Sequence, residues 1–331
     1  MTDGSRSSDA LQGRRMLVTG GAGVIARELL ARLSAAGAEV LSVDRLPLPS
    51  ERPAGVEHLV ADLAVADLAP IERFRPQDVF HLAATFERSV ESPEFWGQNW
   101  SDNVVVSHRL AELAGRGGVD AFLFASSYLV YDPAQYSTMN APTEAVALAE
   151  GSRLGSRNLC GAAKLYGEAE IRFVRDAWAA GFRAVFPRIF RVYGRGSRDV
   201  VSRWVRAALA GDPIEVYHPE NRFDYIFSGD VADCLLRMAA TSGASGVINL
   251  GSGNARPVSA VIDAIEHATG QRLAARTDVV DEPFEASAAD VRRLRTTLDW
   301  TPPTSLEAGV ERLVEFERTG RSAEASVAAD R

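Results

Sequence analysis

Lysine is almost absent from this sequence: 35 of its 36 basic side chains are arginine, and the only lysine is Lys164. An ammonium is a compact point charge with three rotatable donors, whereas a guanidinium is a broad, flat fork. A lysine kept at one position of so arginine-rich a chain suggests chemistry that arginine cannot supply there. Composition alone leaves open the alternative that Lys164 is a chance survivor on a solvated helix face.

Cysteine, clustered histidine and basic stretches are scarce as well. Cys160 and Cys234 are the only cysteines, which excludes a disulfide framework and a cysteine-based zinc site. The five histidines are scattered without metal-ligand spacing, so we predict no metal site. The net charge is −8 and no basic stretch stands out, which argues against a nucleic-acid partner.

Long apolar runs are also missing. No run approaches the ~18 residues that a membrane-spanning helix needs, and the first 13 residues lack the apolar core of a signal peptide. We therefore expect a cytoplasmic protein without a membrane partner. The polar ends, residues 1–13 and 319–331, are expected to be solvated, flexible tails.

Short apolar runs alternate with longer helical stretches from Arg15 onward, beginning with Met16-Leu17-Val18-Thr19 and ending with Ala184-Val185-Phe186. Strands that are buried on both faces have such continuous apolar runs, and the intervening helices imply parallel crossovers. The pattern predicts an α/β fold with a doubly wound parallel sheet, the Rossmann fold, over residues 14–187. Residues 226–250 are expected to return to this domain, and residues 188–318 to form a smaller substrate-binding domain.

A glycine-rich turn, Thr19-Gly20-Gly21-Ala22-Gly23-Val24-Ile25-Ala26, follows the first apolar run and opens a helix. Glycines let the backbone turn tightly and approach a pyrophosphate, whose charge rests on the helix N-terminus. The second strand ends on Asp44, which suits the ribose 2′-hydroxyl and so predicts NAD. Arg45 beside it could instead meet a 2′-phosphate, so NADP stays open as the less favoured alternative.

Further motifs follow this turn in order along the chain. They are Ala61-Asp62-Leu63, His81-Leu82-Ala83-Ala84, Phe124-Ala125-Ser126-Ser127 with Val130-Tyr131, Lys164-Leu165-Tyr166-Gly167-Glu168, Arg188-Ile189-Phe190-Arg191-Val192-Tyr193-Gly194, Asp230-Val231-Ala232, Asn249-Leu250-Gly251-Ser252-Gly253 and Trp300-Thr301-Pro302. Over about residues 14–316, the chain resembles the extended short-chain dehydrogenase/reductases, especially the nucleotide-sugar epimerases and dehydratases.

The resemblance implies positions for the cofactor. Beside the turn residues Gly20, Gly23, Val24 and Ile25, it implies that Asp62 and Leu63 border the adenine. It implies that Ala83 and Ala84 border the phosphates and ribose.

The resemblance also implies roles for three residues near the reacting carbon. Lys164 would hydrogen-bond the nicotinamide ribose and lower the pKa of a neighbouring acid/base. Ser127 would bind the substrate hydroxyl or carbonyl, and Asn103 would lie on the helix beneath the site. The alternatives are a strand-end serine that satisfies the backbone and an amide on a helix surface.

The family's catalytic tyrosine stands four residues before its lysine, and here that position is Cys160. Tyr166 cannot replace it, because a side chain two residues past Lys164 points to a different helix face. A thiolate at Cys160 is one candidate base, and an inert buried cysteine is the equal alternative. Tyr128, directly after Ser127, is the second candidate, with plain aromatic packing as its alternative.

The substrate side departs from the family as well. The arginine that grips the nucleotide diphosphate is replaced by Phe223, with Arg222 one position earlier. An asparagine of the family is replaced by Arg191, which could grip a phosphate or carboxylate from another side. The grip is therefore either rebuilt around Arg191 and Arg222 or lost, and a surface ion pair is the alternative for Arg191.

The resemblance implies an NAD-dependent enzyme of carbohydrate metabolism that works on a small-molecule sugar and forms a homodimer. We expect an NDP-sugar epimerase that oxidises a sugar hydroxyl to a ketone and returns the hydride to the other face. An NAD(P)H-dependent ketosugar reductase remains an alternative, because the motifs overlap. A non-catalytic dinucleotide-binding relative also remains, although the retention of Lys164 argues against it.

Overall fold

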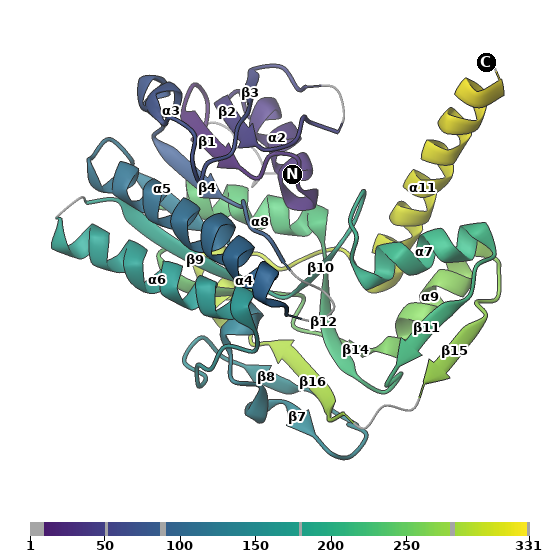
Figure 1. The fold of residues 1–331 in the computed structure, drawn as a ribbon. Coiled ribbons are helices and arrows are strands. Elements are labelled where there is room, and N and C mark those ends of the chain that lie inside the picture. The colour runs from purple at the N-terminus through teal and green to yellow at the C-terminus, as the bar shows by residue number, and fades with distance from the viewer. Residues whose placement is uncertain (1–9, 50–51, 87–90, 179–180, 279–281, 330–331) are drawn as a thin grey trace.

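The computed structural model describes residues 10–49, 52–86, 91–178, 181–278 and 282–329 (Figure 1). Two sheets and their helices make up most of these residues, and a third, two-stranded sheet lies beside the second. Every helix within the described ranges is too short or too polar to span a bilayer.

The first sheet is the predicted doubly wound parallel sheet. Its strands are β1 (Arg15–Thr19), β2 (Glu39–Asp44), β3 (Val56–Val60), β4 (Asp78–His81), β5 (Ala121–Phe124), β9 (Arg183–Ile189) and β13 (Gly246–Leu250). They lie in the order β3-β2-β1-β4-β5-β9-β13, all parallel, and the short β6 (Ser126–Ser127) continues beside β9. The strand order reverses between β1 and β4, and ligands of such sheets bind at the carboxyl ends of the strands there.

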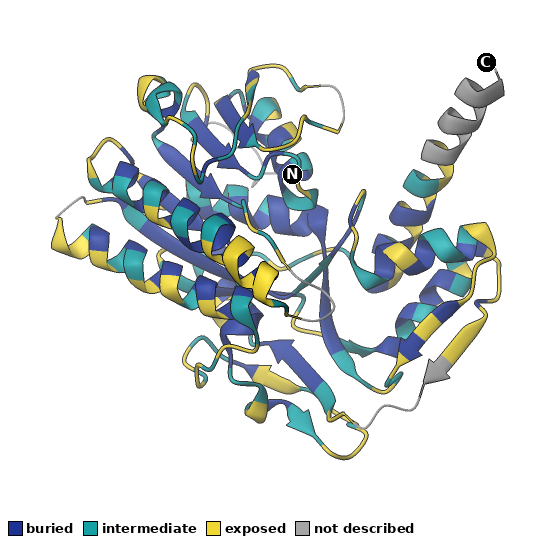
Figure 2. Cartoon of the chain, viewed as in Figure 1, coloured by how far each residue is buried: buried dark blue, intermediate teal, exposed yellow. Residues whose placement is uncertain are grey.

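Helices cover both faces of this sheet (Figure 1), and its strands are mostly buried (Figure 2). Their side chains alternate between the two faces. Met16 and Val18 pack with α2 (Val24–Ala35) and α8 (Ser228–Ala240), whereas Leu17 packs with the helices of the opposite face. Those helices are α3 (Ala69–Phe74), α5 (Val106–Gly115) and α6 (Leu159–Ala177). Because both faces are buried, the strands appear as continuous apolar runs.

The chain after β9 builds a second layer beside the carboxyl ends of the first sheet. Its strands are β10 (Arg191–Tyr193), β12 (Arg222–Phe227), β14 (Ala255–Pro257), β16 (Phe284–Ala289) and the pair β11 (Ile214–Tyr217) and β15 (Ala275–Asp278). Its helices are α7 (Val200–Ala210), α9 (Val258–Thr269) and α11 (Leu306–Ala329), which share one apolar core, and α10 (Arg292–Leu298) packs near β13.

The segment from Asp132 to Leu159 belongs to this second layer. It holds the 3₁₀ turn η3 (Pro133–Gln135), β7 (Ser137–Thr138) and β8 (Val146–Leu148). β7 pairs with β16 antiparallel and β8 pairs with it in parallel, so strands from distant parts of the chain form one sheet.

Parts of the two predicted flexible tails have defined structure. Leu11 is fully buried in the core, and the Gly13 N–H donates to the Gly37 carbonyl at 2.8 Å, so this part of the first tail is anchored to the fold. Residues 1–9 lie outside the described residues. At the other end α11 continues to Ala329, so most of residues 319–331 are helical.

Candidate active site

The glycine-rich turn lies where β1 ends and α2 begins. Gly20 has φ +75°, and a Cβ there would lie 2.7 Å from the Ala83 backbone nitrogen, so only glycine fits. Gly23 caps α2, and no side chain caps the free N–H groups that begin with Val24 and Ile25. These donors and the positive end of the helix dipole suit a pyrophosphate.

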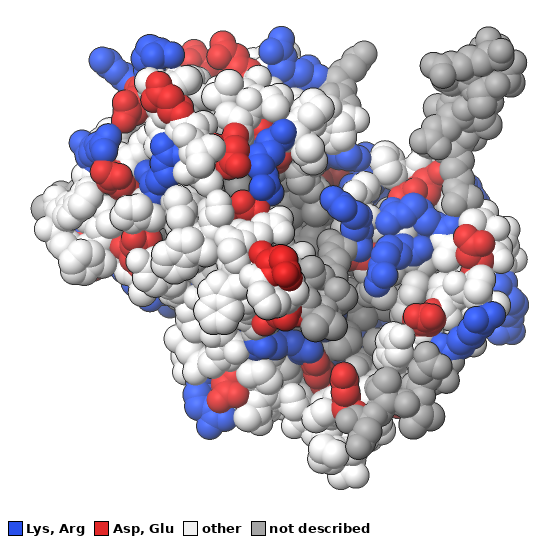
Figure 3. Space-filling view, in the orientation of Figure 1, with Lys and Arg blue, Asp and Glu red and all other residues white. Residues whose placement is uncertain are grey.

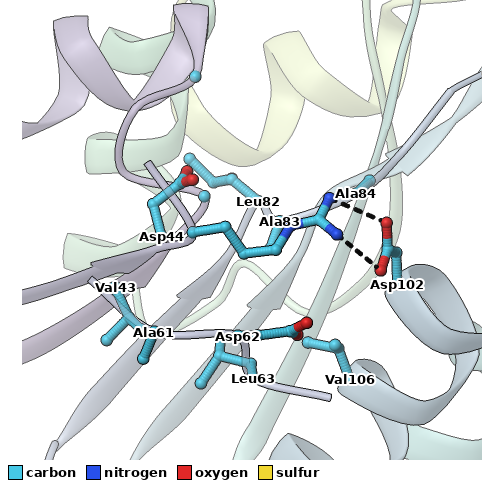
Figure 4. A pocket seen from close by; sticks show the side chains of 13 residues that line it. Val43, Asp44, Ala61, Asp62, Leu63, Leu82, Ala83, Ala84, Asp102 and Val106 are labelled. Carbon is cyan, nitrogen blue, oxygen red and sulfur yellow. Dashed lines mark hydrogen bonds and ion pairs between the residues drawn. The ribbon is translucent and has the colours of Figure 1, made fainter. Parts of the chain in front are cut away.

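A pocket opens beside this turn at the carboxyl ends of β1 to β4, and Figure 4 shows its side chains. It contains most of the residues expected at the cofactor, namely Gly20, Gly23, Asp44, Arg45, Asp62, Leu63, Ala83 and Ala84. The Asp44 carboxylate accepts hydrogen bonds from the N–H groups of Ala22 (3.0 Å) and Leu46 (2.9 Å), which hold it beside the turn. Its remaining lone pairs can accept from ribose hydroxyls. The pocket therefore fits the adenosine half of a dinucleotide.

Asp102 also lines this pocket, and sequence reasoning did not single it out. It lies in a π-helical turn, η1 (Trp100–Val105), between α4 (Pro93–Asn99) and α5. Its carboxylate binds Arg45, with Arg45 Nη1 to Oδ1 at 3.2 Å and Nη2 to Oδ2 at 2.9 Å. In the sequence, the only signal for Asp102 was its place next to Asn103. In the structure it lies in a π-helical turn, a kind of turn often found at functional sites.

Asn103 is a buried positioning residue and not a helix-surface amide. Its Oδ1 accepts from the Thr85 N–H at 2.8 Å, and its Nδ2 donates to the Thr85 carbonyl at 3.0 Å and to Asn99 at 2.7 Å. The amide is therefore used to hold the chain after β4 against η1.

His81 extends this support beneath the pocket. Its ring nitrogens bond Thr19 Oγ1 at 2.8 Å and Ser107 Oγ at 2.9 Å, and Ser107 donates to the Asn103 carbonyl at 2.5 Å. Burial lowers the pKa of His81 well below its ordinary value, and the charge of Lys164 lowers it further. A neutral histidine thus ties β1 and β4 to α5.

Lys164 projects from α6 and is 6% exposed, which rules out a solvated helix face. Its Nζ lies 4.7 Å from the centroid of the Phe124 ring. Burial lowers the pKa of the ammonium, and the neighbouring Cys160 opposes that shift. Burial likewise raises the pKa of the Cys160 thiol, with Lys164 opposing it and Glu91 adding to it. The thiol therefore stays protonated at neutral pH.

Ser127 and Tyr128 lie at the end of β6, opposite the start of α6. Ser126 donates to Glu168 of α6 at 2.6 Å, which anchors this strand end. Ser127 Oγ accepts from the Leu129 N–H at 3.2 Å and caps the 3₁₀ turn η2 (Tyr128–Val130). Tyr128 is buried, and its ring stacks on Phe190 with centroids 5.3 Å apart. Tyr166 is half exposed, as expected from its helix face.

The substrate side is organised around Arg191. Its guanidinium carbon lies 3.5 Å from the centroid of the Phe223 ring and 5.8 Å from that of Tyr128. Nη2 is 3.8 Å from Glu285, which is bound more closely by Arg157. The Arg191 guanidinium thus lies above the ring of Phe223, the position at which the resemblance leads us to expect an arginine.

Two other arginines of this region bind within the protein. Arg222 Nε donates to the Pro142 carbonyl at 3.2 Å, so it contacts the segment between β7 and β8. Arg195, at the end of β10, pairs with Glu28 of α2 through Nε at 2.8 Å. Neither lines the cavity beside Arg191.

The sheet order, the glycine-rich turn and the buried lysine at the strand ends define a dinucleotide-binding enzyme of the Rossmann class. Residues 16–251 match the model of the NAD dependent epimerase/dehydratase family. The chain therefore belongs to that family and uses NAD as its cofactor, as the residues around Asp44 predicted.

Relatives match almost the whole chain. The UDP-glucose 4-epimerase of Mycolicibacterium smegmatis is 30% identical over 330 residues, covering 92% of this chain and 98% of its own. The dTDP-4-dehydro-6-deoxyglucose reductase of Escherichia coli is 23% identical and covers 92% and 97%. The solved structure of MoeE5 in complex with UDP-glucuronic acid and NAD is similar with a TM-score of 0.82 and 28% identity, over 92% of this chain and 99% of that one. Proteins named as an epimerase and as a reductase are thus both among its relatives.

Proposed function

We propose that this protein is an NDP-sugar epimerase that works through a transient ketosugar, with a UDP-sugar as its substrate. The similarity to a UDP-glucose 4-epimerase over nearly all of both chains supports the reaction type. A cavity in the second layer supports the nucleotide-linked substrate, and it is the observation on which the proposal rests.

This cavity combines positive charge with aromatic rings. Its lining includes Arg191, Arg203, Arg276, Trp204, Tyr217, Phe223 and Tyr225. Guanidinium groups pair bidentately with phosphate oxygens, and both aromatic rings and guanidinium planes stack on bases. In Figure 3 basic side chains gather next to α7, the helix that carries Arg203. The set suits a nucleoside diphosphate, with Arg191 in place of the family's missing arginine.

Bound NAD supplies the hydride acceptor and donor of this reaction. Lys164 places a buried positive charge next to the end of β5, where it stabilises negative charge that develops on a nearby oxygen. The Ser127 hydroxyl can donate to the substrate oxygen while it accepts from Leu129. These residues bind and orient the reacting hydroxyl, and a third group must exchange its proton.

We propose Tyr128 for that proton transfer. It directly follows Ser127, it adjoins Arg191, and a phenol reaches a full ring further than a thiol. Cys160 is the less suitable group, because burial keeps its thiol protonated and its side chain is short.

Two matched variants separate these candidates. Tyr128→Phe removes only the hydroxyl and is expected to lower kcat by about 10²–10⁴, the usual contribution of a general acid/base. Cys160→Ala is expected to retain activity close to that of the unaltered protein. The opposite pattern assigns the proton transfer to the thiol.

The reaction itself is tested with purified protein and a panel of nucleotide sugars, beginning with UDP-glucose and UDP-glucuronic acid. An epimerase gives a product inverted at one carbon by NMR without added cofactor. Consumption of added NADH or NADPH in step with product identifies a reductase instead, the function of one relative. No turnover on any sugar while NAD still binds contradicts the enzyme proposal.

We also propose a cytoplasmic homodimer. Large aromatic side chains are exposed on α4, on η1, on α6 and directly after α6, and these elements lie along one side of the first sheet (Figure 2). They are Trp96, Trp100, Tyr166, Phe173 and Trp178. A gathering of exposed apolar side chains on one side of a molecule is typical of a protein–protein interface.

A further inference from the structure

The Arg45–Asp102 ion pair crosses the adenosine pocket. Arg45 directly follows β2, whereas Asp102 lies in η1, and both line the pocket. Figure 4 marks two bonds at the Asp102 carboxylate, and they join it to the two terminal nitrogens of Arg45. We call this pair the clasp. Asp102 is 8% exposed, so its carboxylate depends on Arg45 for its charge balance.

The charges around the pocket make this pairing consequential. Its lining holds three carboxylates, Asp44, Asp62 and Asp102, and a single guanidinium, Arg45. A 2′-phosphate carries a charge of about −1.5 to −2 at neutral pH, as phosphate monoesters do. Arg45 is the only cation in the lining that could compensate this charge, and an arginine at such a place often accommodates the 2′-phosphate of NADP.

We propose that Asp102 is a specificity-determining residue for the cofactor: by holding Arg45 in the clasp, it withholds the guanidinium from a 2′-phosphate and lays it across the adenosine of NAD. To bind NADP, Arg45 would have to leave a buried carboxylate unpaired, which is strongly unfavourable. That carboxylate would also share the pocket with the new phosphate. Asp44 repels the 2′-phosphate, and Asp102 holds Arg45 so that its guanidinium does not pair with that phosphate.

The clasp has a second effect on NAD itself. A planar guanidinium stacks favourably on aromatic rings, purines included. The Arg45 guanidinium joins the end of β2 to η1 within the lining of this pocket. Release of NAD then requires the clasp to open. This inference concerns cofactor choice and retention, and it holds whether the sugar is epimerised or reduced.

The test compares Asp102→Asn, Arg45→Gln and the double variant with the unaltered protein. Each purified holoprotein is incubated with NADP, and the exchange of bound NAD is followed by chromatography of the released nucleotides, which gives relative affinities and the NAD release rate. Asp102→Asn keeps the shape of the side chain and frees Arg45. It is expected to raise the affinity for NADP relative to NAD by about tenfold or more, the effect of one charge-assisted hydrogen bond.

Arg45→Gln, alone and combined with Asp102→Asn, shows whether an NADP gain in Asp102→Asn comes from freeing Arg45 or only from the loss of a negative charge. Arg45→Gln leaves Asp102 without its partner, so it is expected to bring no gain in NADP affinity and to speed NAD release several-fold. The double variant is expected to lose the NADP gain. Asp120→Asn, which removes an exposed carboxylate that binds Arg14 far from the pocket, is the matched control for net charge.

Three results overturn the proposal. These are no NADP gain in Asp102→Asn, a gain that persists in the double variant, and an NADP gain in Arg45→Gln alone. Thermal denaturation of each variant checks that it is folded. Arg45 is half exposed, so Arg45→Gln remains informative even if Asp102→Asn fails to fold.

Discussion

The surroundings of Lys164 explain why this position holds lysine in a chain whose other basic residues are arginine. Its ammonium lies over the Phe124 ring, and the side chain is largely buried between α6 and the end of β5. A guanidinium is larger and planar, and it cannot occupy a space shaped for a compact charge without displacing its neighbours.

Lys164→Arg is therefore expected to lose activity although the charge is kept. Overpacking of a tight interior typically costs about 1–3 kcal/mol of unfolding free energy, and kcat is expected to fall by about 10² or more with the loss of the oriented donor. Urea denaturation and steady-state kinetics measure the two effects. Arg175→Lys, at a solvent-accessible position of the same helix, is the control and should change neither. Full activity in Lys164→Arg would show that a guanidinium can replace the ammonium at this position.

His81 makes a prediction about pH. The pKa of His81 is lowered in the folded protein, so below its ordinary value of 6.5 the unfolded chain binds a proton that the folded protein does not. Stability is therefore full above pH 6.5 and falls as the pH decreases toward the lowered pKa, by about 1.4 kcal/mol per pH unit for one proton. Denaturation at pH 7.0 and 5.5 measures this slope.

The matched variants for that slope are His81→Gln and His267→Gln. His81→Gln is expected to be less stable at pH 7 but to show a shallower pH dependence. His267 is exposed on α9, and its variant should keep the slope of the unaltered protein. Equal slopes in all three proteins would exclude His81 as the titrating group.

Residue roles were predictable to different degrees. Gly20 could be predicted because the tight turn admits only glycine, and Asp44 was proposed for the ribose because it ends the second strand beside that turn. Asp102 was not, because its role depends on a partner 57 positions away that only the folded chain supplies. Asn103 was assigned to the site by resemblance, but its hydrogen bonds to Thr85 show that it acts through the backbone.

At the scale of elements, two glycines set how closely α6 approaches its neighbours. A Cβ on Gly161 would lie 2.4 Å from the Leu129 carbonyl oxygen, and one on Gly167 would lie 2.7 Å from the Phe124 ring. The close approach brings Cys160 and Lys164 next to the end of β6.

Gly161→Ala is expected to push α6 away from η2, because a backbone oxygen cannot give way as a flexible side chain can. The expected loss is about 1–3 kcal/mol of unfolding free energy, as for other overpacked sites, together with reduced activity. Gly97→Ala in α4 is the control: nothing lies within 4 Å of its added Cβ, and alanine in a helix interior should stabilise by up to about 1 kcal/mol. Chemical denaturation of both variants compares them directly. A neutral Gly161→Ala would mean that α6 can shift at no cost.

Strands with an apolar run of their own could be predicted from the sequence, whereas short strands that depend on a distant pairing partner could not. The runs that became β1, β2, β4 and β5 stood out because both faces of a parallel strand are buried. β7 and β8 are two and three residues long, and they exist because β16, more than 130 residues later, pairs with them. A short strand without an apolar pattern has no signature of its own in the sequence.

For the whole molecule, the doubly wound sheet followed from the alternation of strands and helices, whereas the substrate side did not. Cross-strand packing places Arg191 of β10 over Phe223 of β12, so two departures from the family pattern meet at one point. In the sequence alone, the two changes left open whether the phosphate grip was lost or rebuilt. Together they suggest that the positive charge has moved from one strand to its neighbour.

The proposed homodimer is tested at the same scale. Phe173→Glu places a charge on the exposed aromatic side of α6 and is expected to yield monomers, seen by light scattering after size-exclusion chromatography. Met139→Glu, an equally exposed change between β7 and β8, should leave the oligomer intact. A monomer in the unaltered protein, or a dimer in Phe173→Glu, contradicts an interface at this face.

The single lysine also gives the protein a single side-chain amine. A lysine-specific protease can divide the unfolded chain only once, after residue 164, which leaves fragments of nearly equal length. In the folded protein that amine is buried, so an amine-reactive reagent reaches it only when the structure around Lys164 opens. The extent of labelling at Lys164 thus reports how often the structure around this residue opens, and no reactive residue has to be introduced by mutation.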